Sequence, residues 1–413
     1  MNHPAHPRVS RSMEPRPTHP SPLFPPRRRW HAAVAGACLA LATSHAAAQD
    51  WATRSPIPAP SGRFAVGVGI IHVTDSTRAT SRSIRTRPLT VQLWYPALRG
   101  SAGDRAPYVT EPALLDAMVR DGYLDLDSAT IRSWARVRLA ARRDAVPAAA
   151  SSTRGWPVLV FSHGMGVARM NYAALAQELA SHGYVVLAID HPIGGFTLDP
   201  TGRLLRPGAD SLHYPARPII SMVRDWATDD ALVLRRAAAL LRAPGTTPVT
   251  LQLDTTRAGV LGHSLGGAAA LEACRAPAPF VACADLDGAP FGDVETKGVG
   301  KPILVLLSEP DHRHRPPPRD SAEAEGRRRF AAMGRERDST WSAICALQHG
   351  TRCDVVKLLG TGHFSFSDAP FQFPAQLRDV GATLSPVAMH RAIVSRVLAF
   401  FDHALLGTAG GSE

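Results

Sequence analysis

Residues 258–267, AGVLGHSLGG, decide the fold class of this chain. The first four are an apolar run typical of a strand buried on both faces, and the small residues that follow Ser264 predict a helix. Ser264 lies between Gly262 and Gly266, which is the spacing of a strand-to-helix turn so tight that neighbouring side chains would clash. We therefore predict a sharp turn that raises the Ser264 hydroxyl above the edge of a parallel sheet.

Strands and helices alternate on both sides of this turn. Residues 89–95 alternate between apolar and polar side chains, and further strands are predicted at 157–161, 184–189, 258–262, 280–286, 303–307 and 354–359. Helices are predicted at 171–181, 229–241 and 266–274, with a closing helix that Ser385 caps and that ends at Gly407. Such alternation predicts an α/β fold, with a mostly parallel central sheet and helices on both faces.

Composition sets limits on the function. The chain has 413 residues, of which 45% are hydrophobic and 20% are charged, so it is neither a disordered chain nor a multi-span membrane protein. Its net charge of +11 falls to about +6 without the six arginines and one acid of residues 1–48. The remaining positive charge is interleaved with acids and prolines, and we expect no nucleic-acid partner.

The N-terminus has the pattern of a secretory signal peptide. Three arginines at 27–29 precede an uncharged apolar run from Ala32 to Ala42, and small residues then lead to Ala48. We expect cleavage near Ala48 and export to the periplasm or the exterior. Residues 1–48 are thus interpreted as an extension with a signal peptide. Residues 49–413 are interpreted as one α/β domain with insertions near 100–150, 194–222 and 311–350.

Export bears on the cysteines that remain after cleavage. These are Cys274, Cys283, Cys345 and Cys353, which allow three pairings in an oxidising compartment. The two local pairs, Cys274 with Cys283 and Cys345 with Cys353, are the ones we expect. No cysteine or histidine spacing indicates zinc, and we predict no metal site.

A nucleophilic Ser264 needs a base and an acid that orients the base. In folds of this kind the chain order is serine, acid, histidine, with the histidine after the last strand. His363 fits as the base, because it follows the strand at 354–359 within the glycine-containing stretch GTGH. Asp287 and Asp311 each end a strand at the same sheet edge, and their spacing does not choose between them.

The reaction also needs backbone donors for an oxyanion. The turn SHGMG at residues 162–166 follows the buried strand at 157–161, and its glycines let backbone N–H groups approach a substrate. We predict an oxyanion hole formed by the N–H groups of Met165 and Leu265.

Several of these stretches together resemble the plasma-type (isoform II) platelet-activating factor acetylhydrolases. The resemblance covers roughly residues 63–405. It lies in WYP at 94–96, FSHGMG at 161–166, LASHGY at 179–184, the turn at 262–267, LDGAPFG at 286–292 and GHFSFSD at 362–368. The family consists of α/β-hydrolases with a Ser–Asp–His triad. Its acid lies on the strand after the nucleophile helix, which implies Asp287, and its oxyanion donors correspond to Met165 and Leu265. Polyester hydrolases and cutinase-like lipases place the acid after the later strand, in a setting similar to that of Asp311.

The resemblance implies a secreted serine esterase that removes short acyl groups, with the sn-2 acyl groups of phospholipids as a candidate substrate. No metal or organic cofactor is implied. A general carboxylesterase or a cutinase-like polyester hydrolase is the alternative, and a binding protein that has lost catalysis is disfavoured because all four elements of the site are present. The apolar residues of 194–222 are consistent with an acyl pocket, with contact with a lipid or membrane surface, or with a packed loop.

Overall fold

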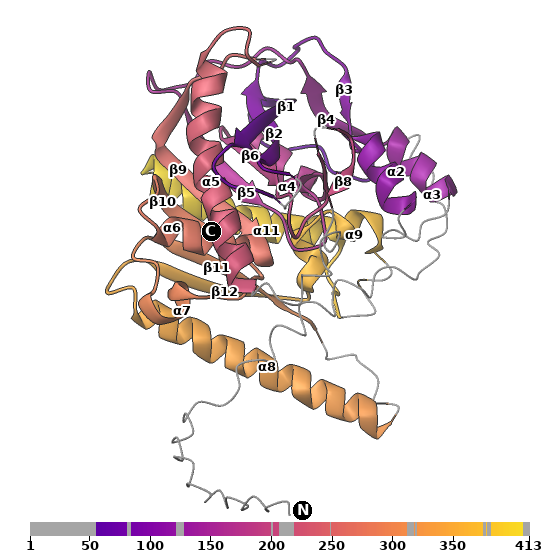
Figure 1. The fold of residues 1–413 in the computed structure, drawn as a ribbon. Coiled ribbons are helices and arrows are strands. Elements are labelled where there is room, and N and C mark those ends of the chain that lie inside the picture. Colours follow the sequence, from indigo (N-terminus) through magenta and orange to yellow (C-terminus); the bar gives the residue numbers. More distant parts are fainter. Residues whose placement is uncertain are drawn as a thin grey trace, which may run out of the picture.

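The computed structural model describes residues 55–80, 84–120, 128–199, 201–205, 219–247, 249–311, 318, 320–374, 377 and 381–407. Ten strands of this part form one twisted sheet, and two short strands form a separate hairpin (Figure 1). The strands are β1 (Ala65–Asp75), β2 (Arg87–Ala97), β3 (Arg105–Pro107), β4 (Arg138–Arg143), β5 (Trp156–Ser162), β6 (Val185–Asp190), β7 (Thr197–Leu198), β8 (Leu204–Leu205), β9 (Leu253–His263), β10 (Phe280–Leu286), β11 (Ile303–Glu309) and β12 (Cys353–Leu359).

The sheet has the order β12-β11-β10-β9-β5-β6-β2-β1-β4-β3. The six strands from β12 to β6 are parallel to their neighbours, whereas β2 pairs antiparallel with both β6 and β1. The predicted mostly parallel sheet is therefore confirmed. The sequence of residues 100–150 indicates an insertion that covers the core. Instead, β3 and β4 from this segment extend the sheet at its edge.

Helices cover both faces of this sheet. They are α2 (Pro112–Arg120), α3 (Ser128–Arg136), η1 (Arg169–Tyr172), α4 (Ala173–Ser181), α5 (Ile219–Arg242), α6 (Leu265–Arg275), α7 (Asp293–Lys297), α8 (Ser321–Ala346), η3 (His363–Phe366), α9 (Ala369–Gln372), α11 (Pro386–Phe401) and η4 (Asp402–Leu406). The closing helix begins as predicted, with Ser385 Oγ accepting a hydrogen bond from the N–H of Ala388. Gly407, the residue after η4, has a left-handed conformation.

The period of two along each central strand divides the core into two layers. In β5, Leu159 and Phe161 pack with α4 and α11 on one face, while Val158 and Val160 pack with α5 and α6 on the other. Both sets are almost fully buried, so the strand is apolar throughout, as a parallel strand covered on both faces must be. The carboxyl ends of β5, β9, β10 and β12 consequently meet at one edge of the sheet.

The longest helix, α8, was not predicted from the sequence. It lies in the 311–350 insertion between β11 and β12, and it runs past the β12 end of the sheet next to α7 (Figure 1). Its 26 residues are rich in arginine and glutamate, and little apolar periodicity is visible in its first half. Among its described side chains, Trp341 and Ile344 in the C-terminal part belong to the buried cluster on the sheet face that α5 and α6 cover.

Candidate active site

Ser264 lies at the turn between β9 and α6, at the carboxyl edge of the sheet. Its φ of 57° is rare for a residue with a side chain, and such strain is typical of functional sites. A Cβ atom on Gly262 would lie 2.3 Å from the carbonyl of Gly266, and one on Gly266 would lie 2.2 Å from the carbonyl oxygen of Ser162. The turn therefore requires glycine at both positions.

The structure brings Ser264, His363 and Asp287 into one hydrogen-bonded chain. His363 Nδ1 donates to Asp287 Oδ2 at 2.8 Å, which leaves Nε2 as the acceptor for the Ser264 hydroxyl at 3.1 Å. The side chain of His363 is 23% exposed, whereas that of Asp287 is 5% exposed. This arrangement matches a serine nucleophile, a base that a substrate can reach, and a buried acid that fixes the base.

The carboxylate of Asp287 is held by more than the histidine. The backbone N–H of Ser308 donates to Oδ1 at 2.6 Å, and the Ser308 hydroxyl donates to Oδ2 at 2.8 Å. Burial raises the pKa of Asp287, but the hydrogen bond and charge of His363, together with the Arg337 charge, bring this pKa down to about 2 from 3.8. Asp287 is therefore ionised across the range in which an esterase works.

The alternative acid, Asp311, is not placed on the histidine. The backbone N–H of Asp311 donates to the carbonyl of Gly381, and His363 Nδ1 is bonded to Asp287. Asp311 lies two residues past the end of β11, beside the bend that leads to the 311–350 insertion. Of the two acids that the sequence left open, Asp287 is the one whose carboxylate contacts His363 Nδ1.

The predicted oxyanion turn lies directly against the nucleophile. A Cβ on Gly164 would lie 3.4 Å from Ser264 Cβ, and Met165 and Leu265 pack in the same apolar cluster. The turn is fixed on both sides of Met165, because the N–H of Gly164 donates to Tyr172 Oη at 3.0 Å and that of Gly166 donates to the carbonyl of Gly194 at 2.7 Å. Leu265 opens α6, where backbone N–H groups have no acceptor within the helix.

His263, the residue before the nucleophile, connects the turn to the base. Its Nδ1 accepts from Tyr172 Oη at 2.8 Å, and its Nε2 donates to the backbone carbonyl of His363 at 2.9 Å. Burial and the neighbouring His363 lower the pKa of His263 to about 3, so it is neutral and both of its nitrogens are used in positioning. Tyr172, Ser308 and Arg337 are site residues that sequence reasoning missed, because nothing in their local sequence reports a contact made across the fold.

Of the two predicted disulfides, the structure contains one and lacks the other. Cys345 and Cys353 form a disulfide with Cα atoms 5.5 Å apart, whereas Cys274 and Cys283 are free thiols. The free pair lies on α6 and β10, where each thiol packs as a small apolar group between helix and sheet.

The signal peptide and the cleavage site near Ala48 lie outside the described residues. Within the described residues, no cluster of His, Cys, Asp or Glu is arranged to hold a metal ion, and no helix has the length and apolarity to cross a membrane.

The described parts of the 194–222 insertion belong to two clusters. Phe196 and Leu204 are buried against α2, as in a packed loop. Ile219 and Ile220, at the start of α5, are partly buried and pack with Met165 and Leu265 next to the nucleophile.

Comparison with known proteins places the chain among ester hydrolases. The model of the family described as platelet-activating factor acetylhydrolase, isoform II, matches residues 51–192, and that of the dienelactone hydrolase family matches residues 144–325. A solved ferulic acid esterase from Streptomyces cinnamoneus superimposes with a TM-score of 0.62 at 29% identity, over 85% of this chain and 93% of that one. The shared architecture is that of an α/β-hydrolase.

Two curated relatives agree with these matches. A probable 1-alkyl-2-acetylglycerophosphocholine esterase of Arthroderma benhamiae is 26% identical over 348 residues, which is 80% of this chain and 84% of that protein. The platelet-activating factor acetylhydrolase of Canis lupus familiaris is 26% identical over 178 residues, 37% of this chain and 40% of the dog protein.

Proposed function

We propose that this chain is an exported esterase that acts on short acyl groups. It belongs to the platelet-activating factor acetylhydrolase isoform II family of α/β-hydrolases, and it is a serine carboxylic ester hydrolase. Its proposed substrates are phospholipids with a short sn-2 acyl chain. The observation that carries the reaction is the continuous hydrogen-bonded chain from Ser264 through His363 to Asp287.

The proposed reaction proceeds through an acyl-enzyme. His363 Nε2 takes the Ser264 proton while Oγ attacks the ester carbonyl, and the Asp287 carboxylate stabilises the imidazolium that forms. The backbone N–H groups of Met165 and Leu265 donate to the oxyanion of the tetrahedral intermediate. His363 then protonates the leaving alcohol, and in the second half of the reaction it activates the water that releases the acid. The protein groups supply each proton transfer, so the scheme uses no cofactor.

The preference for a short acyl chain is supported by the apolar wall beside Ser264. Met165, Ile193, Ile219 and Ile220 are its partly buried members, and they pack over Leu265 and Phe291. Such a wall favours an acyl group over water without offering polar partners. Ile219→Ala/Ile220→Ala is expected to raise the kcat/KM ratio of p-nitrophenyl octanoate to p-nitrophenyl acetate. Val387→Ala, an exposed position on α11, serves as the control. An unchanged ratio would remove these residues from the acyl pocket.

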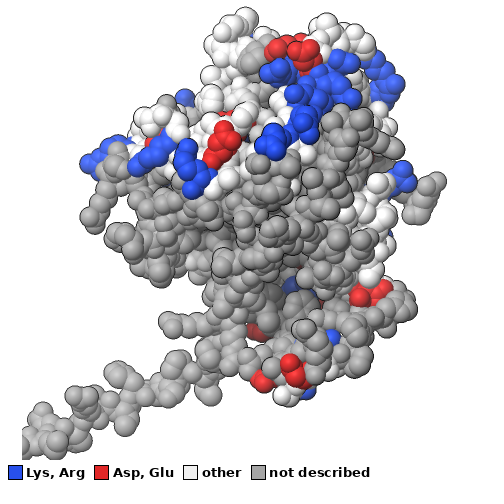
Figure 2. Space-filling model, turned by 90° about the vertical axis from the view of Figure 1, so that its right-hand side faces the viewer, with Lys and Arg blue, Asp and Glu red and all other residues white. Residues whose placement is uncertain are grey.

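Contact with a membrane surface is supported by an arginine-rich face. Figure 2 looks onto the side with β3, β4, α2 and α3, where Lys and Arg gather in two groups in the upper part of the view, with Asp or Glu beside each group. Arg105 lies directly opposite Arg142 in the β3–β4 pair, and like charges at such positions repel. Their guanidinium groups donate to backbone carbonyls rather than to carboxylates, so the charge stays available to an anionic lipid surface.

Vesicle sedimentation tests that contact. Arg105→Gln/Arg138→Gln/Arg142→Gln is expected to weaken binding to vesicles with anionic lipid at least tenfold, while binding to phosphatidylcholine vesicles stays low. The charge-matched control is Arg235→Gln/Arg236→Gln/Arg396→Gln, which changes three exposed arginines on α5 and α11. Equal loss in both variants would show a net-charge effect and contradict a specific face.

Export is supported by the signal-like N-terminus and by the Cys345–Cys353 disulfide, since disulfides persist in oxidising compartments. N-terminal sequencing of the protein recovered from outside the cytoplasm is expected to begin at Gln49. Recovery of uncleaved chain from the cytoplasm alone would contradict export.

The substrate is tested by comparing kcat/KM for an sn-2-acetyl phospholipid, p-nitrophenyl acetate and methyl ferulate, with Ser264→Ala as control. We expect the phospholipid to be the best substrate. Turnover of the activated ester or the ferulate alone would instead favour a general carboxylesterase. The structural similarity to the ferulic acid esterase supports this alternative. A wild-type protein that neither turns over any ester nor reacts with a fluorophosphonate would overturn the catalytic assignment.

A further inference from the structure

Helix α8 brings a cation to the acid of the triad. Arg337, in the second half of this helix, places Nη1 3.5 Å from Asp287 Oδ1 and donates from Nη2 to the backbone carbonyl of Ser308 at 3.2 Å. The guanidinium is only 19% exposed, which strengthens its electrostatic effect relative to a surface pair. The contact spans 50 residues of sequence and originates in the insertion, outside the sheet and turns that carry the triad.

The arginine acts on the carboxylate oxygen that the histidine does not use. His363 Nδ1 and the Ser308 hydroxyl donate to Oδ2, while the Ser308 N–H and Arg337 face Oδ1. With donors on both oxygens, the carboxylate cannot rotate without breaking several hydrogen bonds. Arg337 therefore affects both the orientation of Asp287 and the negative charge that reaches the imidazole.

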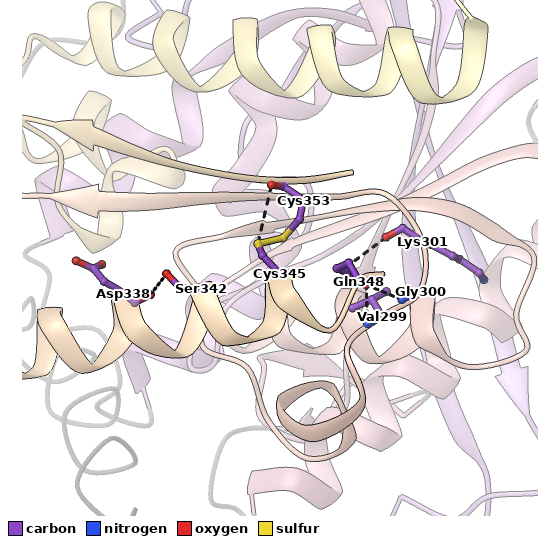
Figure 3. Close-up of a disulfide and its surroundings, with 8 residues drawn as sticks. All are labelled: Val299, Gly300, Lys301, Asp338, Ser342, Cys345, Gln348 and Cys353. Carbon is purple, nitrogen blue, oxygen red and sulfur yellow. Dashed lines mark hydrogen bonds between the residues drawn. A yellow bond between two sulfur atoms is a disulfide. The ribbon is translucent and has the colours of Figure 1, made fainter. Parts of the chain in front are cut away.

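Helix α8 is anchored firmly enough to hold Arg337 in place. Trp341 lies four residues after Arg337 and Ile344 lies seven after it, so all three share one face of the helix. Trp341 and Ile344 are fully buried. Beyond them the Cys345–Cys353 disulfide joins the end of α8 to β12 (Figure 3). Gln348 Oε1 then accepts from the N–H groups of Val299 and Gly300 at 3.1 and 2.7 Å (Figure 3).

We propose that Arg337 is a positioning residue of this esterase, which orients the Asp287 carboxylate and limits its stabilisation of the protonated form of His363. The inference rests on the proposed function, because it requires that Ser264 reacts through His363. Removing the guanidinium leaves the full carboxylate charge to the imidazolium. Protonation of the base then becomes easier, and the acidic limb of the activity profile moves to higher pH.

The other groups around the pair do not oppose this charge effect. From β9, His263 is neutral, because burial and His363 lower its pKa to about 3. From β10, burial and the Asp287 charge raise the pKa of Asp285, which favours its neutral form. From β11, Ser308 is uncharged. On α8 the next residue, Asp338, has Oδ1 4.0 Å from Arg337 Nε, whereas Asp287 faces Nη1 of the same guanidinium. The other carboxylate oxygen of Asp338 is paired with Lys357. Among the described residues, the charge facing Asp287 besides His363 is thus that of Arg337.

The test compares Arg337→Gln, Arg337→Lys and Arg335→Gln in the full chain. Arg335 is an exposed arginine on the same helix, so it controls for net charge and helix substitution. The pH dependence of kcat/KM for p-nitrophenyl acetate is expected to show the acidic limb of Arg337→Gln raised by about 0.5 to 1 pH unit, with kcat lowered about tenfold and KM nearly unchanged. Arg337→Lys is expected to recover part of the shift, and Arg335→Gln to match the wild type.

Two results would overturn the inference. One is a loss of activity in Arg337→Gln with an unmoved acidic limb, which would indicate a structural role for the side chain. The other is an equal limb shift in Arg335→Gln, which would indicate long-range charge. The rate of Ser264 labelling by a fluorophosphonate, measured over the same pH range, reads serine reactivity without a substrate. The labelling test therefore remains valid even if the proposed substrate class is wrong. If the wild-type protein does not react with the fluorophosphonate, the result contradicts the proposed function itself.

Discussion

The described part of this molecule contains two Ser–His–Asp chains, and they differ in whether a substrate can reach them. In the second, Ser162 Oγ lies 2.9 Å from His191 Nε2, and His191 Nδ1 lies 2.8 Å from Asp229 Oδ2. In the first, the corresponding distances are 3.1 and 2.8 Å. Judged by hydrogen-bond length alone, the second chain is at least as good a triad as the first.

The difference lies in access and in the partners of each group. Ser162, His191 and Asp229 are fully buried, and the His191 ring is stacked on Trp226 with centroids 4.1 Å apart. Asp229 is held by Arg87 and Arg78, and Ser162 Oγ also lies 2.6 Å from Asp230 Oδ1. Every group is engaged within the core, so this chain positions β5 and the turn after it.

Ser264, by contrast, stands on a strained turn beside backbone donors, next to a base that solvent reaches. Hydrogen-bond geometry identifies a triad only together with exposure of the base and donors for the oxyanion. The following predictions test that distinction, beginning with the largest expected effect.

Loss of the reactive serine should separate the two chains most clearly. Ser264→Ala is expected to lower kcat for an activated ester by about 10⁶-fold and to abolish labelling by a fluorophosphonate, because the substitution removes the proposed nucleophile. Ser162→Ala should label as the wild type does. Mass spectrometry of the labelled chain checks both, and a label on Ser162 would contradict the distinction.

Replacing each acid in turn should distinguish Asp287 from Asp311 as the acid of the triad. Asp287→Asn is expected to lower kcat about 10⁴-fold, because an amide no longer stabilises the imidazolium or selects the productive tautomer. Asp311→Asn should stay within a few-fold of the wild type. Steady-state kinetics with p-nitrophenyl acetate decides, and the reverse order would return the acid to Asp311.

The two regions should also respond oppositely to pH. The pKa of Asp287 is lowered to about 2, so its contribution to stability is present above about pH 4 and is lost as the pH falls through 2. From this shift, the contribution at neutral pH is about 2 kcal/mol. Burial and the Asp229 charge raise the pKa of Asp230, so the folded chain keeps a proton that the unfolded chain releases above pH 4, and stability from this group falls as pH rises.

Urea unfolding of Asp287→Asn and Asp230→Asn, each against the wild type, measures this contrast. The deficit of Asp287→Asn should shrink on acidification towards pH 2. The stability of Asp230→Asn relative to the wild type should rise between pH 4 and pH 8. Parallel curves for the two variants would contradict the assigned charge states.

The smallest effect is expected from the buried serine. Ser162→Ala should reduce the free energy of unfolding by about 1.5 kcal/mol, because His191 and Asp230 each lose a buried partner. Its kcat should fall less than tenfold. Chemical denaturation and steady-state kinetics test this, and a loss of kcat approaching that of Ser264→Ala would make the second chain part of the chemistry.

Much of the site could be read from local sequence, because its parts are local motifs. The GHSLG turn needs glycine on both sides of Ser264, the apolar runs report strands buried on both faces, and the histidine follows the last strand directly. These signals depend on neighbouring residues, which the sequence displays. They were sufficient for the fold class and for Ser264 and His363 as predicted members of the site.

The remaining decisions depend on which strands and helices become neighbours. The sequence alone left Asp287 and Asp311 equivalent, and only the family resemblance favoured Asp287. The pairing of β10 with β9 and β11 puts its carboxylate under His363. Cys274 and Cys283 are close in sequence, yet α6 and β10 bury them as unpaired thiols.

The sequence by itself thus determined the strand–turn–helix units and the residue types that carry the reaction, since these follow from steric limits on adjacent residues. Only the tertiary structure decided which acid contacts His363, which of two Ser–His–Asp chains stays accessible, and that Arg337 from α8 faces Asp287. Those outcomes depend on distances and burial between segments tens to hundreds of residues apart, and no local pattern encodes them.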